Sequence, residues 1–199
     1  MAARRARLLG IDLDDVSWHK TVRRRLEPGN TSGVLDVPQT QANAMLRSIV
    51  RFVADIPSTG TPLVVWTQGP DELLVDTASL ALRCTSGLIR VSVTVDCDQL
   101  DEPASVTVPL AVGAPNRPSG LVMAAFTRID GPAGVADLWS DALTAFAWEA
   151  VLELARRLCV ETGRDTKGRA LVPVEISAAS RRLLITPMAR HDVTLARLR

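Results

Sequence analysis

The longest helical pattern in the chain covers residues 134–163 and is apolar around most of its circumference. Gly163 suits the left-handed residue that commonly ends a helix. Within residues 142–152 only Thr144 and Glu149 are polar. Because the polar positions along the whole helix drift around its axis, no single side of its centre is left for water. The pattern therefore predicts a helix that is covered on more than one side, by the rest of the chain or by a second copy.

A shorter amphipathic helix is predicted over residues 39–55. Its apolar residues follow the three-to-four spacing that gives a helix one buried stripe. Arg47 and Arg51 mark the side that we expect to face water, and Pro57 closes the helix. The residues of the stripe are Ala42, Met45, Leu46, Ile49, Val50, Val53 and Ile56.

Between residues 62 and 128 the apolar residues alternate with a period of two, which is typical of strands with one buried face. Short connections between successive strands favour an antiparallel meander. Pro109 points to a bulge or an edge in its strand. The expected strands are 63–67, 72–76, 79–84 (which can be continuous with the previous one), 88–95, 106–112 and 121–129.

The two ends of the chain are less regular. Residues 171–176 and 182–188 are expected to form a terminal hairpin, although residues 177–181 also suit a helical turn. Pro173 and Pro187 would place these strands near an edge or weaken them. We expect residues 1–33 to be an N-terminal extension, with a short strand over 6–13 and a helix over 15–26.

Together these elements predict the α+β class. An antiparallel meander of about five to seven strands packs against a long helix in the C-terminal half and a second, shorter helix. We expect residues 34–199 to form a single domain that includes the terminal hairpin and a tail, preceded by the extension of residues 1–33.

Composition narrows the possible roles. The 47% of hydrophobic residues is enough for a core, and the net charge of +1 argues against a general nucleic-acid or anionic-membrane binder. Three cysteines at spacings unsuited to metal binding predict free thiols and a reducing compartment. No apolar run has the length of a membrane helix, and Asp12 interrupts the apolar N-terminal run. We therefore expect a cytoplasmic protein that does not bind membranes.

Residues 8–16 read LLGIDLDDV. This run resembles the first motif of haloacid-dehalogenase-like phosphatases, in which two aspartates one residue apart follow an apolar strand. The resemblance implies that Asp12 attacks phosphorus, that Asp14 is the general acid, and that magnesium is bound beside them. It covers nine of the 199 residues, and the downstream pattern lacks alternating strands and helices. The alternative interpretation is that these carboxylates cap the start of a helix.

Other candidate chemistry is sparse. Asp12, Asp14, Asp15 and His19 could ligate a divalent metal, since Asp15 and His19 would share a helix face. The acidic loop at 96–102 could hold a hard cation through carboxylate oxygens. The loop lacks the glycine and the spacing of a calcium loop, so a solvated turn between strands is favoured. His19 and His191 are the two histidines, and no glycine-flanked serine suggests a nucleophile. We expect no metal and no cofactor.

The extension carries the residues that we expect to contact a partner. Trp18 lies among charged residues and could anchor the extension in another protein, and Val22 is expected to add to this contact. Arg23, Arg24 and Arg25 follow directly. An arginine run is more often a solvated face, and the other interpretation is that it contacts phosphates or acidic protein.

Three functions follow from these patterns. The leading hypothesis is a non-enzymatic structural or interaction subunit of a protein assembly or homo-oligomer, whose partner is another protein or a second copy. The alternative is a small-molecule-binding α+β domain with an apolar pocket between the sheet and the long helix. A remote alternative is the magnesium-dependent phosphatase. The candidate pocket residues are Val91, Leu121, Met123, Phe126, Trp139 and Phe146.

Overall fold

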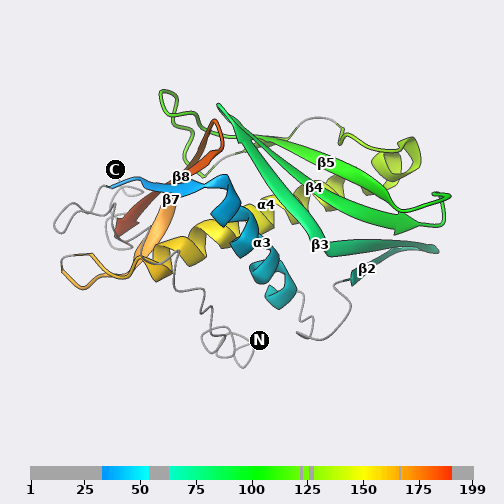
Figure 1. The fold of residues 1–199 in the computed structure, drawn as a ribbon, viewed down its shortest axis with the longest axis horizontal. Helices are drawn as coiled ribbons and strands as arrows, with labels where there is room; N and C mark the ends of the chain where they lie inside the picture. Colours follow the sequence, from blue (N-terminus) through cyan, green and yellow to red (C-terminus); the bar gives the residue numbers. More distant parts are fainter. Residues whose placement is uncertain (1–32, 54–62, 122, 126–127, 166, 190–199) are drawn as a thin grey trace.

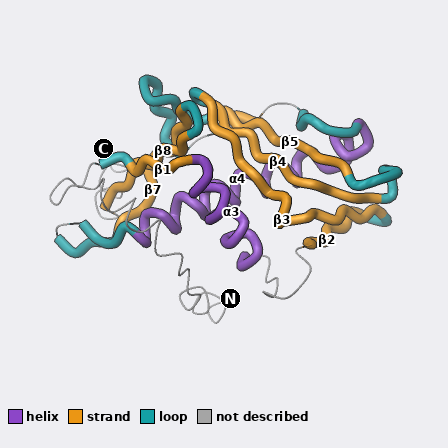
Figure 2. The backbone as a smooth tube through the Cα atoms, viewed as in Figure 1, coloured by secondary structure: helices purple, strands orange, loops and turns teal. Residues whose placement is uncertain are grey.

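The computed structural model describes residues 33–53, 63–121, 123–125, 128–165 and 167–189. The predicted strand at 6–13 and helix at 15–26, and the predicted tail, lie outside these residues. The described elements form two antiparallel sheets and two helices, which confirms the α+β class. Figure 2 shows the terminal strands on the left and the longer strands on the right, with one end of the β3–β4 hairpin (residues 71–97) reaching β8 (Arg182–Ala189) and with α3 (Gln39–Val53) in the middle.

The larger sheet, here called the meander sheet, contains the strands that follow one another along the chain. Its order is β2-β3-β4-β5-β6, with every neighbouring pair antiparallel. This confirms the predicted meander. The strands are β2 (Leu63–Gln68), β3 (Asp71–Thr85), β4 (Leu88–Cys97), β5 (Ala104–Ala111) and β6 (Ala124–Ala125).

The two strands expected at 72–76 and 79–84 are one strand, β3, which is interrupted by a bulge between Asp76 and Ala81. The Asp76 carboxylate accepts a hydrogen bond from the backbone N–H of Ala78 at 2.9 Å. The Ser79 hydroxyl donates to the carbonyl oxygen of Asp76 at 2.7 Å and accepts from the N–H of Thr94 at 2.7 Å. These side chains satisfy backbone groups that the bulge removes from the ladder.

Of the strand predicted at 121–129, the structure confirms Ala124–Ala125, whereas residues 121, 123, 128 and 129 are not in a strand and residues 122, 126 and 127 lie outside the described residues. Thr107 and Asp130 form an isolated antiparallel bridge beyond it. Pro109 lies opposite Arg90 of β4, just before the two residues that β6 covers. Its position matches the prediction of an edge, since a proline cannot donate to a strand on that side.

The smaller sheet, here called the terminal sheet, has the order β1-β8-β7. It contains the predicted terminal hairpin, β7 (Leu171–Ala179) and β8 (Arg182–Ala189), together with β1 (Leu35–Pro38), which the sequence pattern did not predict. The helical turn considered for residues 177–181 is wrong, because β7 continues to Ala179. Pro173 and Pro187 face each other beyond the end of β1, so neither blocks a ladder on the β1 side.

The helices are α3 (Gln39–Val53) and α4 (Ala133–Glu161). Both predicted helices are therefore confirmed in the described residues. Thr162 caps α4, and Gly163 follows with a φ of 99°, in the left-handed region. Figure 1 shows α4 extending from the terminal sheet to the meander sheet, with α3 lying across it. Buried residues of both sheets and both helices form one core cluster.

Helix α4 is covered on one side only, so the prediction that no side of its centre faces water is wrong for the single chain. The remaining side is a continuous outer flank, because its exposed residues recur along the whole helix. Leu138, Trp148 and Leu152 are half-buried beside them. The exposed residues of this outer flank are Asp137, Asp141, Ala142, Ala145, Glu149, Arg156 and Val160.

Helix α3 completes the edge of β3 that β2 leaves uncovered, since β2 pairs only with the first part of β3. The Asn43 side-chain oxygen accepts a hydrogen bond from the N–H of Leu82 at 2.6 Å, and the Gln39 side-chain oxygen accepts one from Cys84 at 2.9 Å. Arg47 donates to the Leu80 carbonyl at 3.2 Å. The expectation that Arg47 simply faces water is therefore wrong.

Candidate protein-interaction site

Among the described strands, β2 forms an uncovered edge of the meander sheet. It pairs with β3 on one side, and no described strand pairs with it on the other. Alternate backbone N–H and C=O groups of β2 therefore point away from the sheet. The strand reads LVVWTQ and holds neither a charged residue nor a proline, the features that usually protect an edge from pairing.

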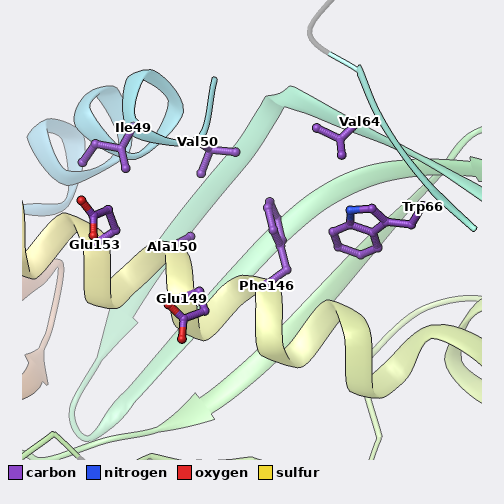
Figure 3. Close-up of a pocket in the computed structure, with 8 residues that line it drawn as sticks. All are labelled: Ile49, Val50, Val64, Trp66, Phe146, Glu149, Ala150 and Glu153. Carbon is purple, nitrogen blue, oxygen red and sulfur yellow. The ribbon is translucent and has the colours of Figure 1, made fainter. Parts of the chain in front are cut away.

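An apolar groove lies between β2 and the two helices, with a volume of about 290 Å³. Figure 3 shows Phe146 of α4 standing between Val50 of α3 and Trp66 of β2. The rings of Trp66 and Phe146 meet edge to face, with centroids 5.2 Å apart and planes at 71°. The residues that line the groove are Ile49, Val50, Val64, Trp66, Phe146, Glu149, Ala150 and Glu153.

Two carboxylates of α4 give this apolar groove a negative rim. Glu149 is exposed, and the side chain of Glu153 is 29% exposed. Glu153 forms a 3.4 Å ion pair with Arg156 one helical turn later. Such an exposed pair is weak, because water and salt screen it. The rim therefore favours a ligand that brings positive charge to an apolar surface.

The opposite face of β2 is apolar as well. Leu63 and Val65 are 42% and 52% exposed, and they lie opposite Asp76 and Leu74 of β3. Next to them the outer face of the meander sheet has a hollow of about 370 Å³. Its lining residues are Leu63, Leu74, Asp76, Ala78, Thr94, Val95, Asp96 and Pro103. A chain placed beside β2 would thus meet apolar surface and carboxylates on both faces of the sheet.

Comparison with known proteins adds no relative. The chain matches no protein-family model, no curated protein and no solved structure. Among the described helices, none is both long enough and apolar enough to cross a membrane.

The sequence-predicted partner residues Trp18, Val22 and Arg23 to Arg25 lie outside the described residues, and so do Asp12, Asp14, Asp15, His19 and His191. The predicted acidic loop begins later than expected, because Asp96 and Cys97 belong to β4, and residues 98–103 connect β4 to β5. In the described ranges, no three histidine, cysteine, aspartate or glutamate side chains gather as a metal site would require.

The predicted pocket residues are mostly elsewhere. Phe146 lines the groove, but Trp139 and Val91 belong to the buried core, and Phe126 lies outside the described residues. The prediction missed Val64 and Trp66. A signal for them exists in the sequence, because β2 begins with four consecutive apolar residues instead of an alternating pattern. Such a strand is apolar on both faces, which suggests cover on both faces.

Two of the described cysteines, Cys84 and Cys159, are unreactive as nucleophiles. Cys84, Cys97 and Cys159 are free and buried. Burial raises the pKa of Cys84 and of Cys159 from 9.0 to about 12. A thiol is a nucleophile only after it loses its proton, so these two groups are inert at neutral pH.

Proposed function

We propose that this chain is a non-enzymatic interaction subunit that binds an extended segment of another protein along β2. The observation that carries the proposal is the uncovered β2 edge, which has apolar surface on both faces and an apolar groove beside it. An added strand gains affinity from main-chain hydrogen bonds and specificity from its alternate side chains. Three buried free cysteines fit the cytoplasmic location that we propose with it.

The partner segment is extended, apolar on both faces, and basic at some positions of the face that meets the groove. Side chains of a strand point alternately to the two faces of a sheet. One set would enter the groove beside Trp66, and the other would cover Leu63 and Val65. Arginine or lysine residues would lie near Glu149 and Glu153, whose charges favour them.

The partner-binding role of Trp18, Val22 and Arg23 to Arg25 stays a prediction about a second contact, made by the extension. Its test is the triple change of Arg23, Arg24 and Arg25 to glutamate. We expect this variant to lose affinity for the natural partner while its binding of a peptide along β2 is unchanged.

A small-molecule-binding domain is the second candidate function. It is supported by the groove, where β2, α3 and α4 surround a mostly apolar volume and the rings of Trp66 and Phe146 form part of the wall. Such a ligand would use Trp66 and Phe146 but not the backbone groups of β2. The two functions therefore differ in whether binding needs main-chain donors on the ligand.

A peptide titration separates the two functions. The probe is a fluorescent ten-residue peptide of valines with arginine at its third and seventh positions, which places both arginines on the face that meets the groove, and its binding to the full chain is followed by fluorescence anisotropy. One control peptide carries glutamate for arginine. Another carries methylated backbone nitrogens on the residues whose N–H groups would face β2. We expect each control to bind at least about tenfold more weakly, since it loses ion pairs or hydrogen bonds.

Two substitutions locate the binding. Trp66→Ala should weaken the basic peptide at least about tenfold, because it removes one wall of the groove. Glu153→Arg should weaken the basic peptide and strengthen the acidic one. Val34→Arg is the matched control, since Val34 is exposed beside the terminal sheet. Equal affinity for the methylated peptide would refute strand addition, and failure of all peptides to bind would refute the proposed function.

A further inference from the structure

We infer that the outer flank of α4 binds the same flank of a second copy, with the two helices antiparallel about a two-fold axis. This contact lies beside the proposed peptide site and does not depend on it. Glu149 stands at the border of the two surfaces, because it is exposed on the flank and also lines the groove.

The spacing of apolar residues on the flank is that of a helix-pairing seam. Leu138, Ala145 and Leu152 recur every seven residues, and Trp148 lies three residues after Ala145. A seven-residue repeat of this kind keeps one stripe facing a partner helix. Trp148 and Leu152 are half-buried by their own chain, and no described residue covers the remainder of their surface. A second helix on this stripe would remove that surface from water.

The charges on the flank select the antiparallel direction. The N-terminal half exposes Asp141 and Asp137, which forms a 2.8 Å ion pair with Arg128. Glu149 is exposed near the centre, and Arg156, which pairs with Glu153 of its own helix at 3.4 Å, is exposed in the C-terminal half. If the axis passes between Trp148 and Glu149, Asp141 of each copy lies opposite Arg156 of the other. A parallel pair would instead place Asp141 of one copy beside Asp141 of the other, and these like charges would repel.

The same register pairs residues of different size. Ala145 of each copy lies opposite Leu152 of the other, so a small side chain faces a large one and the helices can approach closely. In a two-fold interface every such contact occurs twice. Each substitution on the flank therefore acts twice in the dimer.

Charge reversal tests the register. Sedimentation equilibrium of the full chain, up to about 200 µM, gives the dimer dissociation constant. We expect a dimer that Asp141→Arg or Arg156→Asp weakens about tenfold, since each variant replaces two attractive contacts by repulsive ones. The double variant should regain most of the affinity. Asp98→Arg, an exposed aspartate in the β4–β5 connection, should have no effect.

Cysteine cross-linking gives an independent readout. Ala145→Cys together with Leu152→Cys should yield a covalent dimer under mild oxidation. Ala145→Cys alone should not, because the two copies of residue 145 would be offset by about 10 Å along the helix axis. The side chains changed in these variants are exposed or half-buried, so the variants should fold. They are Asp141, Ala145, Leu152 and Arg156.

Three results would overturn the inference: a wild-type monomer throughout the concentration range, a dimer that both charge reversals leave unchanged, or equal cross-linking by the single and double cysteine variants. None of these results bears on peptide binding along β2. Conversely, a dimer that does not bind the peptides would leave this interface standing while it refutes the proposed function.

Discussion

Two sulfur atoms in the core of the protein are held far from water. Cys84 is 1% exposed and Cys159 0%. Burial raises the pKa of both thiols from 9.0 to about 12, whereas the unfolded chain keeps the ordinary value. The unfolded state therefore releases these protons first as the pH rises. Their contribution to stability is complete below pH 9 and falls between pH 9 and 12.

This difference predicts the alkaline stability of the protein. Between pH 8 and pH 10 each thiol should lower the free energy of unfolding by about 1.4 kcal/mol. Urea unfolding at the two pH values measures the change. The chain has no tyrosine and two lysines, Lys20 and Lys167, so few other groups titrate in this range. Cys84→Ala and Cys159→Ala should each remove one thiol's share of this decrease. If both variants lost as much unfolding free energy between the two pH values as the wild type, the decrease could not come from these thiols.

Individual alanines of α4 also explain why the apolar pattern of this helix was misleading. Ala142 and Ala145 count as apolar in a helical pattern, yet both are exposed. A methyl side chain costs little in water, so alanine marks neither face of a helix. Trp148 and Leu152 are different, because they keep large apolar side chains half out of water. The predicted cover of α4 was wrong for the alanines, and for these two side chains we propose a second copy.

At the scale of the elements, α3 acts on β3 as a neighbouring strand would. The two side-chain oxygens of Gln39 and Asn43 accept hydrogen bonds from successive outward N–H groups of β3. Gln39 and Asn43 lie one helical turn apart, so their side chains are on the same face of α3 and can both accept hydrogen bonds from the edge of β3. The bulge of β3 between Asp76 and Ala81 separates the part of β3 that pairs with β2 from the part that is hydrogen-bonded to α3.

Asn43→Ala should therefore destabilise the protein by about 1–3 kcal/mol, because it leaves the buried N–H of Leu82 without its acceptor. Urea unfolding measures the loss. Asn43→Asp keeps an acceptor and should retain most of the stability. Ser48→Ala is the matched control on the same helix, since the exposed Ser48 hydroxyl bonds only to Ala44 of its own helix. A loss in the control as large as in Asn43→Ala would contradict the role of Asn43.

The elements that the sequence predicted well share one property: a long repeat with one buried face. Ile89, Val91, Val93 and Val95 alternate along β4, and all are buried. Strands β1 and β6 contain four and two residues, which is too short for a periodic signal. The groove could not be predicted from local patterns, because it depends on how α3 and α4 cross beside β2. Its apolar walls Ile49 and Val50, however, belong to the predicted stripe of α3.

At the scale of the whole molecule, α4 connects the two sheets. Leu154 is 0% exposed and belongs to the core cluster that contains residues of both sheets. Backbone hydrogen bonds also join the two sheets. The N–H of Gly87 donates to the carbonyl oxygen of Ala178 at 3.0 Å, and the N–H of Ala178 donates to the carbonyl oxygen of Gly113 at 2.9 Å. We therefore expect the two sheets to unfold together.

Leu154→Ala tests this coupling. It should lower the free energy of unfolding by about 2–5 kcal/mol, because it opens a cavity in the shared core. Hydrogen exchange should become faster in β4 and in β8 by a similar factor, as in one cooperative unit. Val160→Ala, on the exposed side of the same helix, should change neither quantity appreciably. Faster exchange confined to one sheet would show that the sheets unfold separately.

The uncovered edge of β2 has a consequence for the life of the protein in the cell. An apolar edge can template pairing with any extended chain, including a damaged or newly made one, and repeated pairing leads to fibres. If the chain is made in excess of the partner that we propose, the surplus should aggregate or be degraded. We therefore expect balanced synthesis of the two proteins, and joint production should raise the yield of intact subunit.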